Sequence, residues 1–163
     1  MAKTLNQIEG RVPQPMPPEV QGLIANVERL MDMPIDQFSV GDLRLMIGQN
    51  WGTEHLMPRA LGVLESNPFV CGTFFPGDLL NATLRLPAAY WTKHPVHHKR
   101  ALGIARQGLD ALEVRCDQAR TRAFKRYDAR LDEVECLDSE ERDVKQWCLD
   151  FLARYDEDGR ATD

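Results

Sequence analysis

Apolar side chains recur at spacings of three and four along most of the chain, and this periodicity limits the possible folds more than any other feature. It predicts an amphipathic helix between about residues 17 and 33, which Pro34 ends. It is longest from residue 96 onward, where a slip near residue 120 indicates a bend or a break. No segment of useful length alternates apolar and polar residues as a half-buried strand would. The chain is therefore predicted to be all-α: a compact helical bundle of short N-terminal helices plus a long basic helix and an acidic C-terminal helix.

Capping signals divide the periodic segments into separate helices. Ser39 and Asp42 form an S-x-x-D capping box, which predicts a short helix that stops near Gly48. Thr53 is expected to cap the next helix, and Asp138 or Ser139 the last one. These boundaries fit one domain of 163 residues, 1–163, with residues 1–16 polar, proline-rich and expected to be flexible.

The segment from residue 69 to residue 91, FVCGTFFPGDLLNATLRLPAAYW, is dense in aromatic and helix-breaking residues. Its Pro-Gly-Asp triplet predicts a turn, with Asp78 capping the helix that follows. Large side chains between helix-breaking residues are typical of the corners of a small helical bundle. Four aromatic residues are therefore predicted to lie in the core: Phe74, Phe75, Tyr90 and Trp91.

The four cysteines, Cys71, Cys116, Cys136 and Cys148, form no C-x-x-C pair and have no histidine at zinc-finger spacing. No apolar run approaches the ~18 residues that a membrane span needs, and the N-terminus lacks the apolar region of a secretory signal. The chain is therefore expected in the cytoplasm, with its cysteines reduced and at least half-buried.

A metal or catalytic centre has little support in the sequence. His94, His97 and His98 are the best metal candidates, but no cysteine or carboxylate completes the ligand set locally, and the alternative is a surface linker between two helices. None of the common nucleotide-binding, hydrolase or metalloprotease motifs occurs. No metal, no cofactor and no enzymatic activity are predicted.

Charge is unevenly distributed along the chain. Residues 1–95 have 7 basic and 9 acidic side chains, residues 96–130 have 9 and 4, and residues 131–163 have 4 and 12. The basic and acidic segments could pack together and partly cancel, which is the favoured interpretation. Alternatively, the acidic end faces a cationic partner. Nucleic-acid binding by the basic segment is disfavoured, because Asp117 and Asp128 interrupt its arginines.

Between residues 38 and 95 the chain resembles the immunity proteins of contact-dependent growth inhibition (CDI) systems. A D-L-R-x-L-I-G-Q-like helix is followed by an E-x-L-x-P-x-A-L-x-x-L-x-x-N-P-like helix, a P-G-D-L-L stretch and an L-P-x-x-[FY]-W ending. These correspond to residues 42–49, 54–68, 75–80 and 86–91. Met46 departs from the pattern, and residues 96–156 form a charged helical extension longer than the resemblance leads us to expect.

The resemblance implies a non-enzymatic protein that binds and neutralises the C-terminal toxin domain, often a nuclease, of a cognate large exported effector. Because nucleases are usually cationic, the acidic end of this chain is the expected contact surface. Its candidate residues are Glu140, Glu141, Asp143, Asp150, Asp156, Glu157 and Asp158. The alternatives are a small helical regulatory or adaptor protein that binds another protein or nucleic acid and, less favoured, an enzyme.

Overall fold

The computed structural model describes residues 2–12, 22–127 and 136–155, and these residues form eight α-helices and one short 3-10 helix with no strand. The prediction of an all-α bundle is confirmed. The first predicted helix begins later than expected, at Leu23, and its proposed proline start lies outside the described residues. The α-helices are α1 (Leu5–Glu9), α2 (Leu23–Met31), α3 (Val40–Gly48), α4 (Thr53–Ser66), α5 (Asp78–Leu84), α6 (Ala88–Lys93), α7 (Pro95–Tyr127) and α8 (Ser139–Ala153).

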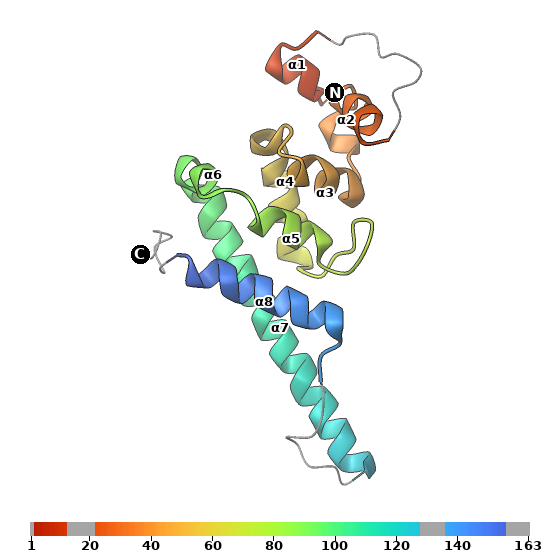
Figure 1. Cartoon of the computed structure of the whole chain (residues 1–163), viewed down its shortest axis with the longest axis vertical. Helices are drawn as coiled ribbons and strands as arrows, with labels where there is room; N and C mark the ends of the chain where they lie inside the picture. Colours follow the sequence, from red (N-terminus) through yellow and green to blue (C-terminus); the bar gives the residue numbers. More distant parts are fainter. Residues whose placement is uncertain (1, 13–21, 128–135, 156–163) are drawn as a thin grey trace.

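The helices are arranged along one long axis (Figure 1). Helices α1 and α2 lie at one end, α3, α4 and α5 lie in the middle, and the second half of α7 extends to the other end. Helix α8 crosses α7 and returns toward α6. The ring of Tyr155, just after α8, lies 4.3 Å from that of His98 in the first turns of α7, which confirms that the end of α8 packs on the start of α7.

A single cluster of buried apolar side chains connects all of these helices, from Leu5 in α1 to Tyr155. Within residues 1–16, which were expected to be flexible, residue 1 and residues 13–16 lie outside the described residues, and α1 packs into this cluster. Leu5 is fully buried, and a Cβ atom at Gly52 would lie only 2.7 Å from its methyl carbons. The helix begins with a capping box between Thr4 and Gln7, which satisfies its first N–H groups.

The capping box at the start of α3 is confirmed, and Asp138, one of the two predicted caps, caps α8. The predicted caps of α4 and α5 are wrong by one residue. Gly52 and Gly77 are the N-caps there, with φ of +59° and +87°. Only glycine adopts such left-handed backbone without cost, so the polar residue that follows becomes the first helical residue. Thr53 donates a hydrogen bond to the Asn50 side chain, and Asp78 accepts hydrogen bonds from the preceding loop.

Helix α7 runs without a break from Pro95 to Tyr127, so the break considered near residue 120 is not present. Residues 117–122 are exposed or half-buried, beyond Cys116, the last buried side chain of α7 that is described. Apolar spacing there does not have to match a packing partner, which explains the slip.

Closer to its start, α7 is joined to α4 by Arg100, whose Nε and Nη2 donate to the Glu65 carboxylate at 2.6 and 2.8 Å.

The predicted aromatic core is correct for Trp91 and wrong for Phe74. Trp91 is only 1% exposed, and its indole N–H donates to the Leu86 carbonyl. Phe74 is 65% exposed, with the Arg44 guanidinium 4.5 Å from its ring centroid. Phe75 and Tyr90 are half-buried.

None of the helices in the described ranges combines the length and apolar character that a membrane crossing requires.

Candidate partner-binding site

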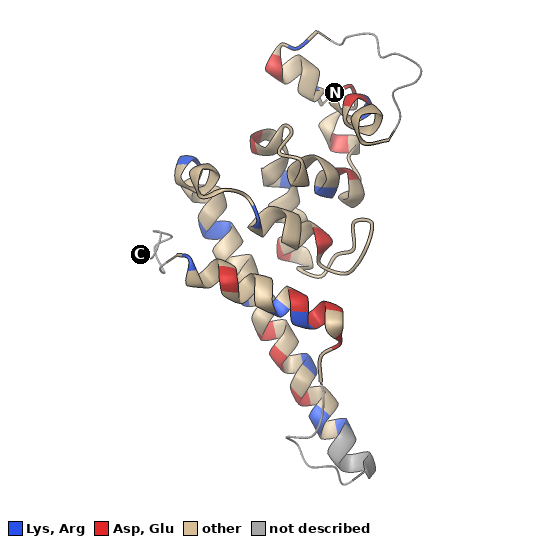
Figure 2. Ribbon diagram, in the orientation of Figure 1, with Lys and Arg blue, Asp and Glu red and all other residues tan. Residues whose placement is uncertain are grey.

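A groove of about 830 Å³ lies where α7, the start of α8 and the connection between α4 and α5 meet. Apolar side chains and carboxylates share its lining. The apolar residues are Phe69, Pro76, Ala111, Val114 and Val144, and the acidic residues are Asp110, Asp138, Glu140 and Glu141. Figure 2 shows the acidic first turn of α8 beside the middle of α7. We call this feature the acidic groove.

Two of its carboxylates hold the first turn of α8 in place. The Asp138 carboxylate accepts from the Glu141 backbone N–H at 2.8 Å, and Glu141 Oε2 accepts from the Asp138 N–H at 3.2 Å. This is a reciprocal capping box, and the acidic residues also complement the positive end of the helix dipole. Asp138 and Glu141 are therefore held by the fold before any partner arrives.

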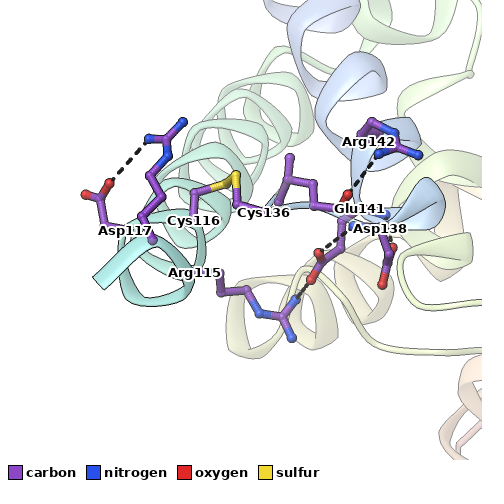
Figure 3. The surroundings of a disulfide bond; sticks show 9 residues. Arg115, Cys116, Asp117, Cys136, Asp138, Glu141 and Arg142 are labelled. Carbon is purple, nitrogen blue, oxygen red and sulfur yellow. Dashed lines mark hydrogen bonds and ion pairs between the residues drawn. A yellow bond between two sulfur atoms is a disulfide. The ribbon is translucent and has the colours of Figure 1, made fainter. Parts of the chain in front are cut away.

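Arg115 joins the walls of the groove (Figure 3). Its Nη1 donates to Glu141 Oε1 at 2.6 Å, and its guanidinium carbon lies 5.5 Å from the ring centroid of Phe69. Charges of the basic and acidic segments thus cancel at this point, as the favoured interpretation of the charge distribution expected. The cancellation is local, because no ion pair or side-chain hydrogen bond to Glu140 or Asp110 occurs within the described part of the chain.

A disulfide fixes the same wall and corrects the expectation that the cysteines are reduced. Cys116 of α7 is bonded to Cys136, two residues before the α8 cap, with their Cα atoms 4.8 Å apart (Figure 3). The pairing arises from the packing of α8, which Cys136 precedes, against α7, and the separation of 20 residues matches no cysteine motif. Cys71 and Cys148 are free, and burial raises the pKa of Cys148 to about 12.

The predicted contact residues fall into three groups. Glu140 is exposed at the groove rim, and Glu141 lines the groove but is held by Arg115. Asp143 and Asp150 are exposed outside the groove, and their spacing of seven residues places them on one stripe of α8. The remaining three, Asp156, Glu157 and Asp158, lie outside the described residues.

Sequence reasoning missed Asp110 and the apolar floor. Asp110 lies in the basic segment, where it was counted only as a charge, and Phe69 and Pro76 were assigned to a link and a turn. A groove formed by three separate segments leaves no local sequence signal. Asp138 was identified as a cap, and nothing in its spacing indicated that it also lines a groove.

The three histidines of the metal candidate do not converge. His94 and His97 stack with ring centroids 5.4 Å apart, and the Tyr90 hydroxyl lies 2.9 Å from His97 Nδ1. His98 is buried instead, packed against Trp91, Phe151 and Tyr155, so the surface-linker alternative is wrong for this residue. Among the residues whose positions are described, no group of three or more potential ligands could hold a metal ion.

Burial and charge set the protonation of this histidine cluster. Burial lowers the pKa of His98, and the pKa of His97 is lowered by burial first and then by His94 and Arg100. Beside them, a hydrogen bond from Lys93 lowers the pKa of the Glu54 carboxyl. The Tyr90 hydroxyl that contacts His97 stays protonated near neutral pH, because burial and then the charge of Glu54 raise its pKa to about 12.

A smaller cavity of about 420 Å³ lies between α3 and α5. Its charged and amide side chains are those of Arg44, Gln49, Asn50, Asp78, Asn81 and Arg85. Among the described residues, Arg44 Nε and Asn81 Oδ1 are buried there without a hydrogen-bond partner. The C-terminal ends of both helices lie at this cavity, so their carbonyl dipoles offset the charge of the arginines.

The helices that surround the groove differ in how far they match known proteins. The family model described as CDI immunity proteins matches residues 7–101, which is more than half of the chain and extends the resemblance at residues 38–95 in both directions. No curated protein matches the chain. The match includes α2 to α6 and ends in the first turns of α7, whereas most of the acidic groove lies beyond it. The chain belongs to the family of CDI immunity proteins, and its role is immunity against CDI toxins.

Proposed function

We propose that this protein binds the C-terminal toxin domain of a cognate exported CDI effector in the cytoplasm of the cell that makes both, and blocks it without catalysing a reaction. The observation that carries the proposal is the position of the exposed carboxylates of α8. They lie after residue 101, where the family match ends. Surfaces that differ between relatives are where an inhibitor can read its own toxin, while the matched helices supply a common scaffold.

The chemistry of the exposed side chains favours a nuclease as the toxin. A nuclease domain must attract a polyanion, so its active-site cleft is cationic. Carboxylates on a rigid helix can occupy such a cleft in place of phosphates, and the opposite charges accelerate encounter. Glu140, Asp143 and Asp150 are exposed, and Asp150 accepts a hydrogen bond from the Gln146 side chain through one oxygen. Asp156, Glu157 and Asp158 would extend the same acidic segment.

The test is a binding and protection experiment with the purified C-terminal domain of the cognate exported effector. Wild type is expected to form a stoichiometric complex, to stop nuclease activity in vitro, and to restore growth of cells that express the toxin domain. If the purified toxin domain were neither bound nor inhibited, the proposal would be wrong.

Charge reversal then tests the surface. Glu140→Lys/Asp143→Lys is expected to reduce the association rate about tenfold or more at low salt and to flatten its salt dependence. The matched control is Glu9→Lys/Asp36→Lys, which reverses two exposed carboxylates far from α8 (Figure 1). Equal association rates for the two double variants would show that the acidic face of α8 does not contact the toxin.

A further inference from the structure

We infer that the acidic groove receives one segment of the toxin domain, in which a bulky apolar side chain is flanked by arginine or lysine side chains. This inference rests on the proposed function and specifies the chemistry of the partner. It differs from a general attraction between charged surfaces, because it requires an apolar contact at the groove floor and cations at two defined rim positions.

The floor is apolar and accessible. Val114 is 55% exposed on the α7 side of the groove, and the half-buried Phe69 lines the same groove. The volume of about 830 Å³ is larger than one side chain and suits a short loop or a helical turn. Burying an apolar anchor in such a hollow is the usual source of binding energy at a protein interface.

The rim selects the charge of the occupant. Asp110 belongs to α7 and Glu140 to α8, so the two carboxylates lie on different walls of the groove. Arg115, the cation among the lining residues, is already neutralised by Glu141. An incoming phosphate would meet uncompensated carboxylates, whereas arginine or lysine would find partners on both sides. The groove therefore favours a cationic protein segment over nucleic acid.

The walls are held in place before binding. The Cys116–Cys136 disulfide fixes α7 to the segment that enters α8, one residue along from Arg115. The Asp138–Glu141 capping box orders the first turn of α8. Gly77 allows the α5 cap to approach Val144 so closely that a Cβ atom there would lie 2.8 Å from Val144 Cγ2. Little conformational freedom remains to be lost, so contacts in the groove convert more fully into affinity.

The experiment measures the dissociation constant of the full-length protein for the purified toxin domain. Val114→Lys and Asp110→Lys are each expected to weaken binding about tenfold or more. Their controls lie on the same helix outside the groove lining: Val96→Lys replaces an exposed valine, and Glu113→Lys reverses an exposed carboxylate three residues from Asp110. Both controls are expected to bind within about twofold of wild type, and thermal unfolding must show that all four variants are folded.

The outcomes separate the two proposals. If wild type binds and inhibits the toxin domain but all four variants bind alike, the groove inference is overturned and the proposed function stands. If wild type does not bind, the proposed function fails first. A photo-crosslinker placed at Ala111 is expected to capture a toxin peptide with an apolar side chain between basic ones. A cross-link to a second copy of this chain, or to its own residues, would overturn the inference.

Discussion

The carboxylate of Asp78 lies 2.6 Å from the backbone nitrogen of Gly72, six residues earlier in the chain. It also accepts hydrogen bonds from the N–H groups of Thr73 and Phe74 at 2.8 and 3.0 Å. One carboxylate on a residue that is 1% exposed therefore holds the loop that ends at Pro76, a residue of the acidic groove.

Asp78→Ala is expected to lower the free energy of unfolding by about 3 kcal/mol, because three loop N–H groups lose their acceptor. Asp78→Asn keeps one acceptor oxygen and should cost less. Urea unfolding followed by circular dichroism measures both, with the exposed Asp36→Ala as control. A loss no larger than that of the control would mean that water replaces the carboxylate and that the loop does not depend on it.

Gly77→Ala is expected to destabilise the protein by roughly 1–3 kcal/mol, because it places a side chain on left-handed backbone and against Val144. Gly62→Ala is the matched control, since Gly62 lies inside α4 and a Cβ atom added to it would meet nothing within 4 Å. That change should stabilise the helix by about 0.5–1 kcal/mol. Thermal unfolding of the two variants must give shifts of opposite sign.

The disulfide is expected to contribute about 3 kcal/mol, the loop-entropy value for a closure of this length. The Cys116→Ser/Cys136→Ser variant should therefore unfold at lower urea concentration than the oxidised wild type, and at the same concentration as wild type in reducing agent. Cys71→Ser, which alters an exposed free cysteine, is the control. A reducing agent that left the wild-type unfolding midpoint unchanged would contradict this contribution.

Asp138→Ala and Glu140→Ala are expected to separate structural from binding carboxylates in the same turn. Loss of the Asp138 cap should cost about 1 kcal/mol of stability. Glu140→Ala should leave the unfolding free energy within about 0.5 kcal/mol, since it is an exposed surface substitution. Under the proposed function, it should instead slow toxin association. Equal stability of the two variants would show that the capping box is not needed by α8.

His98 is expected to make stability depend on pH in the mildly acidic range. Burial lowers its pKa in the folded protein, so the unfolded chain takes up a proton first. The folded protein therefore has its full stability above the ordinary histidine pKa of about 6.5, where His98 is neutral in both states. This contribution to stability is lost as pH falls below that value toward the lowered pKa of the folded state.

His98→Phe tests this dependence, because phenylalanine can retain the contacts with Trp91, Phe151 and Tyr155 and removes a buried nitrogen that has no hydrogen-bond partner among the described residues. Unfolding free energies measured between about pH 8 and 5.5 should fall less steeply for the variant. His97→Gln should remove only the part of the pH dependence of stability that comes from His97, a nearby half-buried histidine. Parallel curves for wild type and His98→Phe would rule out the assigned role.

Much of the fold could be predicted because its helices are encoded locally. The capping boxes at Ser39 and Asp138 and the apolar spacing within α3 and α4 need no knowledge of tertiary contacts. Two features were missed because a distant segment decides the local structure. Leu5 is ordered by its contact with Gly52 at the start of α4, and Phe74 leaves the core because Asp78 holds its loop in a form that directs the ring to Arg44.

Of the candidate site, only its negative charge could be predicted from the sequence. Glu140 was identified from the acidic run, but its neighbours Asp110 and Val114 come from α7, a separate helix earlier in the chain. The disulfide was missed for the same reason, since the proximity of Cys116 and Cys136 depends on the packing of α8 against α7. Antiparallel packing of two charged helices creates both features, and neither helix alone contains them.

The family match ends at residue 101, within an unbroken helix of 33 residues. The matched helices and the α7 side of the groove are thus joined by one continuous helix, with no intervening loop that could absorb a change of length. Inserting a single residue after Gly103 would rotate everything beyond it by about 100° and advance it by about 1.5 Å, turning Asp110 and Val114 away from α8. Under the proposed function, a relative with another toxin specificity is therefore expected to differ in this half by substitution or by whole-turn changes in length, which preserve helical phase.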